Sequence, residues 1–448
     1  MRLRIACAAA LLTLPMLAGC DAGGGTDGAP NPRTPTSHRA GGVAAGDWPT
    51  YHRSNARDGY AADLAPLSSL ETAWHARLDG AVYGQPLVIG DRLYAATEHD
   101  TIYALNADTG RVIWSRHLGR PVPVSDLPCG NIDPLGITGT MAYDAATDRL
   151  FAVAETDGGT HTLVGVSATT GKVEVATRVE PPRGEKLAHQ QRAALTVLDG
   201  RVYIPYGGLY GDCGDYIGSV VSVTTDGADK ITYAIPTSRE GGIWAPGGAA
   251  VAGNRLYYAV GNGESTSTYD GSDAVIALTP TLRRAGYYSP PSWRADNAAD
   301  LDLGSMSPAV VGDYVYGDGK RGEGYVLRRG GLGHVATLRV CPAFGAPSVV
   351  GSTVYVPCPD GPRAVTVSGH PKVRWHADVP AAGSPVVGGG AVWVVDYDGG
   401  TLYALDPATG ATRASLHIGA APHFASPTLA RDRAYVGLLD GVVAVSGA

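Results

Sequence analysis

Five side chains between residues 244 and 320 are of types that can bind a cation and move a proton. Trp244 offers a flat ring for stacking, and Asn262 offers an amide oxygen of the kind that hard cations such as calcium prefer. Asp300 and Asp302 are two positions apart, so on an extended segment both carboxylates point to one side, where either could act as a general base. Lys320, in a glycine-rich segment, would add a positive charge.

Each of these residues also has a purely structural explanation. Trp244 could anchor a loop or the core, and Asn262 could be a turn residue between two glycines. Asp300 could cap a turn, and Lys320 could belong to a hairpin turn. The elements that position these side chains must therefore be established before the residues are assigned a role.

The N-terminus predicts export. Arg2 and Arg4 precede an apolar run that ends in Leu17-Ala18-Gly19-Cys20, which looks like a bacterial lipoprotein signal. We expect a signal peptide over residues 1–19, lipid on Cys20 that anchors the chain to the outer face of the bacterial cell membrane, and a flexible tether over 20–46. An ordinary signal peptide or a membrane anchor is the alternative, although the apolar run is short for a membrane span.

Six cysteines occur, and two of them, Cys7 and Cys20, belong to the predicted leader and lipid site. In an exported protein the remaining four are expected to pair, with three connectivities open. We favour Cys341 with Cys358, which are close in sequence, and Cys129 with Cys213, which lie in long loops: the four are Cys129, Cys213, Cys341 and Cys358. A metal site is the rival interpretation, but no Cys-x-x-Cys spacing is present.

The composition of the 448 residues is typical of a globular protein with many turns. Apolar residues make up 44% and charged residues 17%, with 62 glycines and 31 prolines. The formal net charge of -7 and the lack of a dense Lys/Arg run argue against nucleic acid as a partner.

A repeated unit organises the chain, and its clearest copy runs from Gly84 to Trp114. Short runs rich in strand-forming residues alternate there with turns such as Gly90-Asp91 and Asn106 to Gly110. The four strands expected in this copy are 87–89, 93–96, 101–105 and 111–114. One small sheet cannot bury both of its faces, so it must stack against a neighbour.

Eight first-strand anchors mark the copies, and they lie 54 to 60 residues apart in the first half and 38 to 42 apart in the second: Pro86, Thr140, Ala194, Gly248, Pro308, Pro347, Pro385 and Pro427. Such periods with four strands each predict an all-β, eight-bladed propeller over residues 47–448. The last copy holds three strands only, and the segment Leu70 to Leu78, which carries Trp74, can supply the fourth. Pairing the two chain ends would close the ring and remove exposed sheet edges, whereas a solenoid would need caps.

The ending of the repeat, as in Ala104 to Trp114, resembles the tryptophan-docking motif of the pyrroloquinoline quinone (PQQ)-like eight-bladed propeller family. The resemblance covers about residues 68–448 and implies that the outer-strand tryptophans pack between neighbouring blades. The family includes both quinoprotein dehydrogenases and non-catalytic scaffold lipoproteins of outer-membrane barrel assembly. The motif therefore implies the fold, not the function.

The resemblance to quinoprotein alcohol dehydrogenases also implies roles for the five side chains. Trp244 would form the floor under PQQ, and Asn262 would ligate calcium together with Asp300. Asp302, or else Asp300, would be the catalytic base, and Lys320 would lie beside the quinone oxygens.

Three features of the sequence depart from the quinoprotein alcohol dehydrogenase pattern and argue against that activity. The chain has no adjacent cysteine pair, no Cys-x-x-Cys-His for haem, and no glutamate in the segment 207–218 where a calcium ligand is expected, although Asp212 or Asp215 could replace it. We therefore expect a monomeric lipoprotein scaffold that binds a ligand or protein through the long loops between Cys129 and Lys320. A PQQ- and calcium-dependent alcohol dehydrogenase is the alternative.

Overall fold

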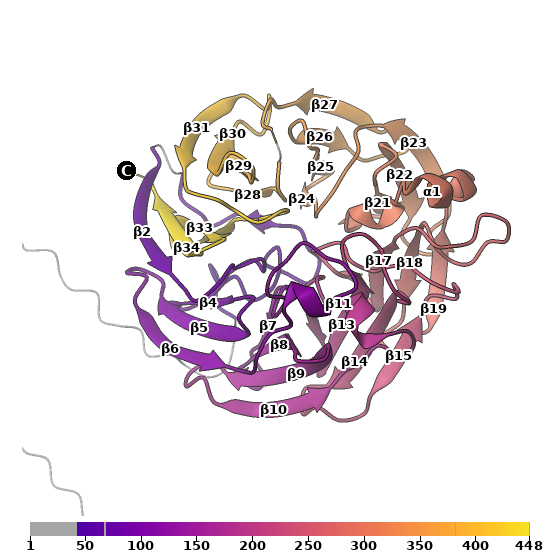
Figure 1. Ribbon diagram of the computed structural model, residues 1–448. Helices are drawn as coiled ribbons and strands as arrows, with labels where there is room; N and C mark the ends of the chain where they lie inside the picture. The colour runs from indigo at the N-terminus through magenta and orange to yellow at the C-terminus, as the bar shows by residue number, and fades with distance from the viewer. Residues whose placement is uncertain (1–42, 67–68, 381, 448) are drawn as a thin grey trace, which may run out of the picture. The chain divides into compact units, whose positions relative to one another are not determined.

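Eight sheets are arranged in a ring in a computed structural model of the protein, and their innermost strands surround the axis, which we call the channel (Figure 1). The structure describes residues 43–66, 69–380 and 382–447. The predicted signal peptide, Cys20 and most of the predicted tether lie outside these residues. The eight-bladed, four-stranded architecture predicted from the repeats is confirmed.

The first four blades contain the long insertions. Blade 1 consists of β3 (Leu87–Ile89), β4 (Arg92–Ala96), β5 (Thr101–Asn106) and β6 (Val112–His117). Blade 2 consists of β7 (Ala142–Asp144), β8 (Arg149–Thr156), β9 (Thr160–Ser167) and β10 (Val173–Arg178). Blade 3 consists of β12 (Thr196–Leu198), β13 (Arg201–Gly208), β14 (Ser219–Thr224) and β15 (Ile231–Ala234), with β11 (His189–Gln190) added beside β13. Blade 4 consists of β16 (Ala250–Ala252), β17 (Arg255–Val260), β18 (Ala274–Leu278) and β19 (Arg284–Tyr288).

The last four blades are close to the bare repeat. Blade 5 consists of β20 (Ala309–Val311), β21 (Tyr314–Gly317), β22 (Glu323–Arg328) and β23 (His334–Arg339). Blade 6 consists of β24 (Ser348–Val350), β25 (Thr353–Val356), β26 (Arg363–Thr366) and β27 (Lys372–His376). Blade 7 consists of β28 (Val386–Gly388), β29 (Ala391–Asp396), β30 (Thr401–Leu405) and β31 (Thr412–His417), with β1 (Tyr60–Ala61) beside β28. Blade 8 consists of β32 (Thr428–Ala430), β33 (Arg433–Leu438), β34 (Gly441–Ser446) and β2 (Glu71–Arg77).

The short helices all lie in connections between blades. The 3-10 turn η1 (Val124–Asp126) follows blade 1, η2 (Lys186–Ala188) follows blade 2, and α1 (Trp293–Ala299) and η3 (Leu303–Ser305) follow blade 4. Within the described residues, no helix has the length and apolar character needed to cross a membrane.

Strand β2 closes the ring, as the missing strand of the last repeat predicts. It pairs antiparallel with β34 from Glu71 opposite Ser446 to Arg77 opposite Gly441 (Figure 1). The pairing gives blade 8 its outer strand from the other end of the chain. An edge that would otherwise lie open between the first and last blades is thereby covered.

Tryptophans on outer strands lock neighbouring blades together. Trp74 donates from Nε1 to the carbonyl oxygen of Ala107 in blade 1 at 3.1 Å, and Trp114 donates to Ala168 in blade 2 at 3.2 Å. Each ring also covers a turn glycine of the next blade: a Cβ on Gly110 would lie 2.6 Å from the Trp74 ring. The inter-blade packing implied by the tryptophan motif is thus present.

The N-terminal segment 48–59 crosses the innermost strands of several blades. Its carbonyl oxygens accept backbone hydrogen bonds of 2.7 to 3.1 Å from the second residue of each of five innermost strands: Val88, Tyr143, Val251, Val349 and Val387. Trp48, Tyr51, His52 and Arg57 of this segment are all buried. The segment therefore fills one part of the channel and ties blades 1, 2, 4, 6 and 7 to one another.

Candidate functional site

Lys320 lies between two carboxylates at the junction of blades 4 and 5. Its Nζ is 2.5 Å from Oδ1 of Asp300 and 2.8 Å from Oδ2 of Asp302. The backbone N–H of Asn262 donates to the other oxygen of Asp302 at 2.5 Å. Four of the five residues singled out in the sequence are therefore in direct contact.

Strand ends and close glycine contacts place these groups. Asn262 follows β17, Asp302 directly precedes η3, and Lys320 follows β21. Gly261 can have no side chain, because a Cβ there would lie 2.5 Å from Oδ1 of Asp302. Gly304 is restricted in the same way, since its Cβ would lie 2.3 Å from the backbone nitrogen of Gly261. The glycines thus allow the two blades to meet at Asp302.

The two aspartates differ in environment. Asp302 is buried, and burial raises its pKa, while the Lys320 ammonium and the Asn262 N–H oppose that rise. The Asp300 side chain is 60% exposed and touches Lys320 from the solvent side. Burial lowers the pKa of Lys320, but the two carboxylates outweigh it, so the net change is upward. Asp302 with Lys320 is accordingly a buried ion pair, and Asp300 is its exposed third member.

Glu240 belongs to the same cluster, although it is not among the residues singled out in the sequence. The amide nitrogen of Asn262 donates to Oε2 of Glu240 at 3.4 Å, and Glu240 is buried. Burial raises its pKa to about 7, with Arg239 opposing the rise and Asp212, Glu264 and Asp302 adding to it. Glu240 directly precedes Gly241-Gly242, so a glutamate before glycine was present in the very segment that contains Trp244.

The proposed replacements for the glutamate do not join the cluster. Asp212 instead accepts a hydrogen bond of 2.5 Å from the Tyr216 hydroxyl, and its backbone oxygen accepts one from Arg239. Asp215 is exposed, and its backbone oxygen accepts from Glu185. Glu240, which begins the connection into blade 4, is the carboxylate that contacts the side chain of Asn262, and no hydrogen bond joins Asp212 or Asp215 to Asn262 among the described residues.

The cluster supplies only some of the oxygen ligands that a hard cation such as calcium requires. Asn262 contacts both carboxylates through its nitrogens, the backbone N–H donating to Asp302 and the side-chain amide to Glu240. Carboxylate oxygens are ligands that calcium prefers, in sets of about six to eight. However, both oxygens of Asp302 already serve the Asn262 N–H and Lys320. Across residues 43–66, 69–380 and 382–447, no group of three or more His, Cys, Asp and Glu side chains is arranged to hold a metal.

Trp244 belongs to an aromatic layer at the centre of the ring. Its ring centroid lies 6.1 Å from that of Phe424, and Phe344 stacks on Phe424 at 6.4 Å and 14°. The Arg192 guanidinium lies 4.8 Å from the centroid of Phe424 and 5.8 Å from that of Tyr83. These side chains are half-buried, so part of each is accessible to solvent. Trp244 is linked to the acidic cluster through Gly242, whose oxygen accepts from the N–H of Gly261 at 2.9 Å.

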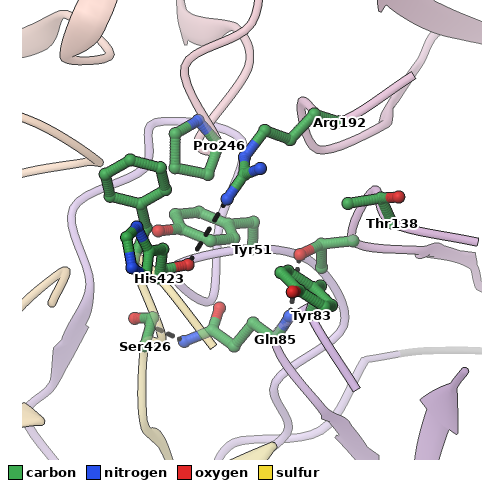
Figure 2. Close-up of a pocket in the computed structure, with 10 residues that line it drawn as sticks. Tyr51, Tyr83, Gln85, Thr138, Arg192, Pro246, His423 and Ser426 are labelled. Carbon is green, nitrogen blue, oxygen red and sulfur yellow. Dashed lines mark hydrogen bonds between the residues drawn. The ribbon is translucent and has the colours of Figure 1, made fainter. Parts of the chain in front are cut away.

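A small pocket lies next to this aromatic layer (Figure 2). Its lining includes side chains from the N-terminal segment and from blades 1, 2, 3, 4 and 8: Tyr51, Tyr83, Gln85, Thr138, Thr140, Arg192, Pro246, His423, Phe424 and Ser426. The lining leaves about 10 Å³ for the centre of a water molecule, which is room for about one water. A three-ring cofactor such as PQQ does not fit in this space.

Two long loops lie near one another at the blade 1 to 3 side and are joined by a disulfide. Cys129 pairs with Cys213, and the second bridge joins Cys341 with Cys358, which is the connectivity that the sequence favours. Residues Val122, Ile132, Leu135 and Leu209 form a separate apolar cluster under the first bridge. Tyr210, beside that bridge, is 73% exposed. We call residues 119–136 and 208–217 the lid loops.

The fold and the aromatic channel define the class of the protein as a PQQ-like eight-bladed propeller. The chain belongs to this family: a family model described as outer membrane protein assembly factor BamB matches residues 62–254 and 342–447.

Comparison with individual proteins gives relatives that are named as dehydrogenases. The chain is 27% identical over 248 residues to a polyvinylalcohol dehydrogenase of Sphingopyxis sp. (strain 113P3), a match that covers 49% of this chain and 35% of that protein. The chain thus matches about a third of the length of this relative.

Two solved structures share the fold. Quinohemoprotein alcohol dehydrogenase from Comamonas testosteroni superposes with a TM-score of 0.70 and 17% identity, over 90% of this chain and 81% of that one. BamB from Moraxella catarrhalis superposes with a TM-score of 0.62 and 15% identity, over 84% of this chain and 99% of that one. At these identities the likeness concerns the fold alone.

Proposed function

We propose that the protein is an exported, membrane-anchored propeller that binds a ligand or a partner protein at the mouth of its channel, between the lid loops and Lys320. The observation that carries this proposal is the small central pocket, in which Arg192, Phe424 and Tyr51 leave room for about one water. Buried cofactor sites in proteins are commonly several hundred Å³ in volume. The family model named after an assembly factor supports a binding role.

The mouth has the chemistry of a binding face. Half-buried rings of Trp244, Phe344 and Phe424 offer apolar surface, and exposed Tyr210 on a lid loop adds a large amphipathic side chain. Asp300 and Lys320 provide charged groups at the rim. Aromatic anchors surrounded by polar groups are characteristic of interaction sites.

Photo-crosslinking from a residue replaced by a photoreactive amino acid tests the location of this face. We expect position 210, in full-length protein in its native membrane, to give a discrete adduct. Position 112 on outer strand β6 is the matched control, since Val112 is 51% exposed and carries an apolar side chain as well. Adducts from position 112 alone, or equal adducts from both positions, would contradict the proposed binding face.

The proposed anchoring is tested at Cys20. We expect the wild-type protein to sediment with membranes and to incorporate labelled fatty acid, and Cys20→Ala to be unlabelled. A wild-type protein without label would refute the lipid anchor, while the binding proposal would still be judged by the crosslinks.

A second candidate function is a PQQ- and calcium-dependent alcohol dehydrogenase. The observation in its favour is the contact of Asn262, Asp302 and Lys320, to which Glu240 adds a further carboxylate. The matched relatives include proteins named polyvinylalcohol dehydrogenase and alcohol dehydrogenase (quinone). The carboxylates of Glu240 and Asp302 suit calcium in part, but the central pocket has room for about one water and not for the quinone, so we derive no catalytic step.

Reconstitution with calcium and PQQ distinguishes the two functions. For the binding protein we expect no quenching of tryptophan fluorescence at micromolar PQQ and no dye-linked alcohol oxidation. Saturable quenching together with dye reduction, both lost in Asp302→Asn, would establish the second candidate instead. Calcium alone should raise the thermal midpoint only if the donor set binds it, in which case Glu240→Gln would abolish the rise and Glu264→Gln, an exposed neighbour, would not.

A further inference from the structure

Arg192 lies at the centre of the propeller without a carboxylate partner. Among the described residues its guanidinium forms no ion pair, and it makes one long hydrogen bond, from Nη2 to the backbone oxygen of His423 at 3.4 Å. Its Nε is buried and has no partner. Figure 2 shows the side chain crossing the pocket beside the Tyr51 ring. A guanidinium carries five N–H donors, so most of the donor capacity of Arg192 is unused.

A second arginine, which is buried, adds positive charge near Tyr51. Arg57 is 2% exposed and donates only to neutral oxygens, those of Ala249, Thr50, Tyr51, Leu195 and Thr196. Both arginines act electrostatically on Tyr51. The carboxyl that acts on Arg192 is Glu98, whose pKa burial raises to about 8. Among the described residues neither arginine forms an ion pair, and burial favours the protonated form of Glu98, so the two positive charges have no paired carboxylate.

The pocket beside Arg192 offers further donors. The Tyr51 hydroxyl is buried without a hydrogen bond of ordinary geometry, although the Ser384 and Ser426 hydroxyls lie near it. Burial outweighs the effect of these two hydroxyls and raises the pKa of Tyr51 to about 12, so the hydroxyl keeps its proton. Thr140 also lines the pocket; its oxygen accepts from the N–H of Gln85, which leaves its own O–H free to donate. The pocket thus combines a guanidinium with neutral O–H donors and contains no ionised acid among its lining residues.

We propose that this pocket binds a single-atom anion, a halide such as chloride, held by Arg192 with the hydroxyls of Tyr51 and Thr140. A water molecule would satisfy the donors but would leave the charges of half-buried Arg192 and buried Arg57 without an anion, and uncompensated charge is costly in a protein interior. The space beside Arg192, which is that of about one water, suits a single-atom anion better than a polyatomic one. The site is independent of the function proposed above.

Crystals of the full chain soaked in bromide provide the direct test. We expect an anomalous difference peak in the pocket, within hydrogen-bond distance of Arg192, and no such peak in Arg192→Gln. Water density without anomalous signal in wild-type crystals would overturn the proposal.

A titration in solution excludes binding that occurs only at crystal concentrations. At constant ionic strength, with gluconate as the balancing anion, bromide should raise the thermal unfolding midpoint of the wild-type protein. We expect the half-maximal concentration to rise at least tenfold in Arg192→Gln and less in Tyr51→Phe. Arg413→Gln removes an exposed arginine that pairs with Asp406, and it should leave the titration unchanged.

An identical bromide titration in wild type, Arg192→Gln and Tyr51→Phe would overturn the proposal. If Arg192→Gln does not fold, the bromide soak of wild-type crystals and the titration of Tyr51→Phe still test the proposal. The Tyr51→Phe change removes only one oxygen atom and keeps the ring.

Discussion

At the scale of one residue, Asp100 illustrates how burial changes the ionisation of a carboxyl group. It is fully buried, and neither of its carboxylate oxygens has a hydrogen-bond partner. Burial raises its pKa to about 9, and Glu98 and Glu155 add to the rise. The folded protein therefore holds this carboxyl protonated at neutral pH, whereas the unfolded chain ionises it.

The raised pKa of Asp100 makes the free energy of unfolding depend on pH. Between about pH 4 and about pH 9 the folded state binds the proton and the unfolded state does not, so the free energy of unfolding falls as the pH rises. We predict that Asp100→Asn is more stable than wild type at pH 8 by a few kcal/mol and that the gain shrinks towards pH 4. Urea unfolding at several pH values measures this difference.

The control for this prediction is Asp313→Asn, which changes an exposed carboxylate of blade 5. An equal gain in both variants, or a gain of Asp100→Asn that does not depend on pH, would refute the assigned ionisation.

His161 contributes in the same direction for a different reason. It lies between Glu155, 3.3 Å from its Nε2, and Glu180, 3.1 Å from its Nδ1. Burial lowers its pKa, but the two carboxylates outweigh burial and raise it to about 9. Its stabilising contribution is present in full below about pH 6.5 and is lost as the pH rises through about 9. Both groups make the protein more stable on the acidic side of neutrality.

At the scale of the element, a glycine in the turn before an outer strand allows a tryptophan of the neighbouring blade to pack against that turn. Gly110 has φ of +71°, and its Cα faces the Trp74 ring so closely that a Cβ would lie 2.6 Å away. The same arrangement recurs where Gly171 meets Trp114. A side chain at such a position meets both backbone strain and a clash with a ring that is fixed by its hydrogen bond.

We predict that Gly110→Ala lowers the free energy of unfolding by about 2–4 kcal/mol, from roughly 1–2 for the left-handed backbone and the rest from the displaced tryptophan. Gly200→Ala is the matched control, because Gly200 has φ of +73° and open space around its Cα, so only the backbone cost applies. Equal costs in chemical denaturation would show that the Trp74 contact does not limit stability.

At the scale of the whole molecule, the ring depends on a strand contributed from the other end of the chain. Strand β34 has β33 on one side and β2 on the other. Without β2, the backbone groups of β34 would be exposed as an open edge and Trp74 would no longer cover blade 1.

We predict that a chain beginning at residue 79 is largely aggregated in size-exclusion chromatography, whereas a chain beginning at residue 43 elutes as a monomer with a cooperative thermal transition. The first chain lacks β2 and the N-terminal segment, and the second keeps both. A chain beginning at residue 62 retains β2 but loses Trp48, Tyr51 and Arg57, and it should fold with a lower midpoint. A monomeric, cooperative chain from residue 79 would refute the closure argument.

Local sequence patterns were sufficient to predict the blades and their closure. Strand runs, turn glycines and the tryptophan motif act within about forty residues, because hydrogen bonding inside one sheet and docking on the next blade are properties of neighbouring segments. The segment Leu70 to Leu78 could be assigned because the last copy lacked a strand.

Only the tertiary structure decided the composition of the channel. Arg192, Trp244, Phe344 and Phe424 come from four different blades, and nothing in the residues around each of them indicates that they meet. Glu240 was missed for the same reason, since its partner Asn262 is reached through a strand end of the next blade. A propeller brings one short segment of every blade to its axis, so contacts at the axis depend on ring geometry and not on distance along the chain.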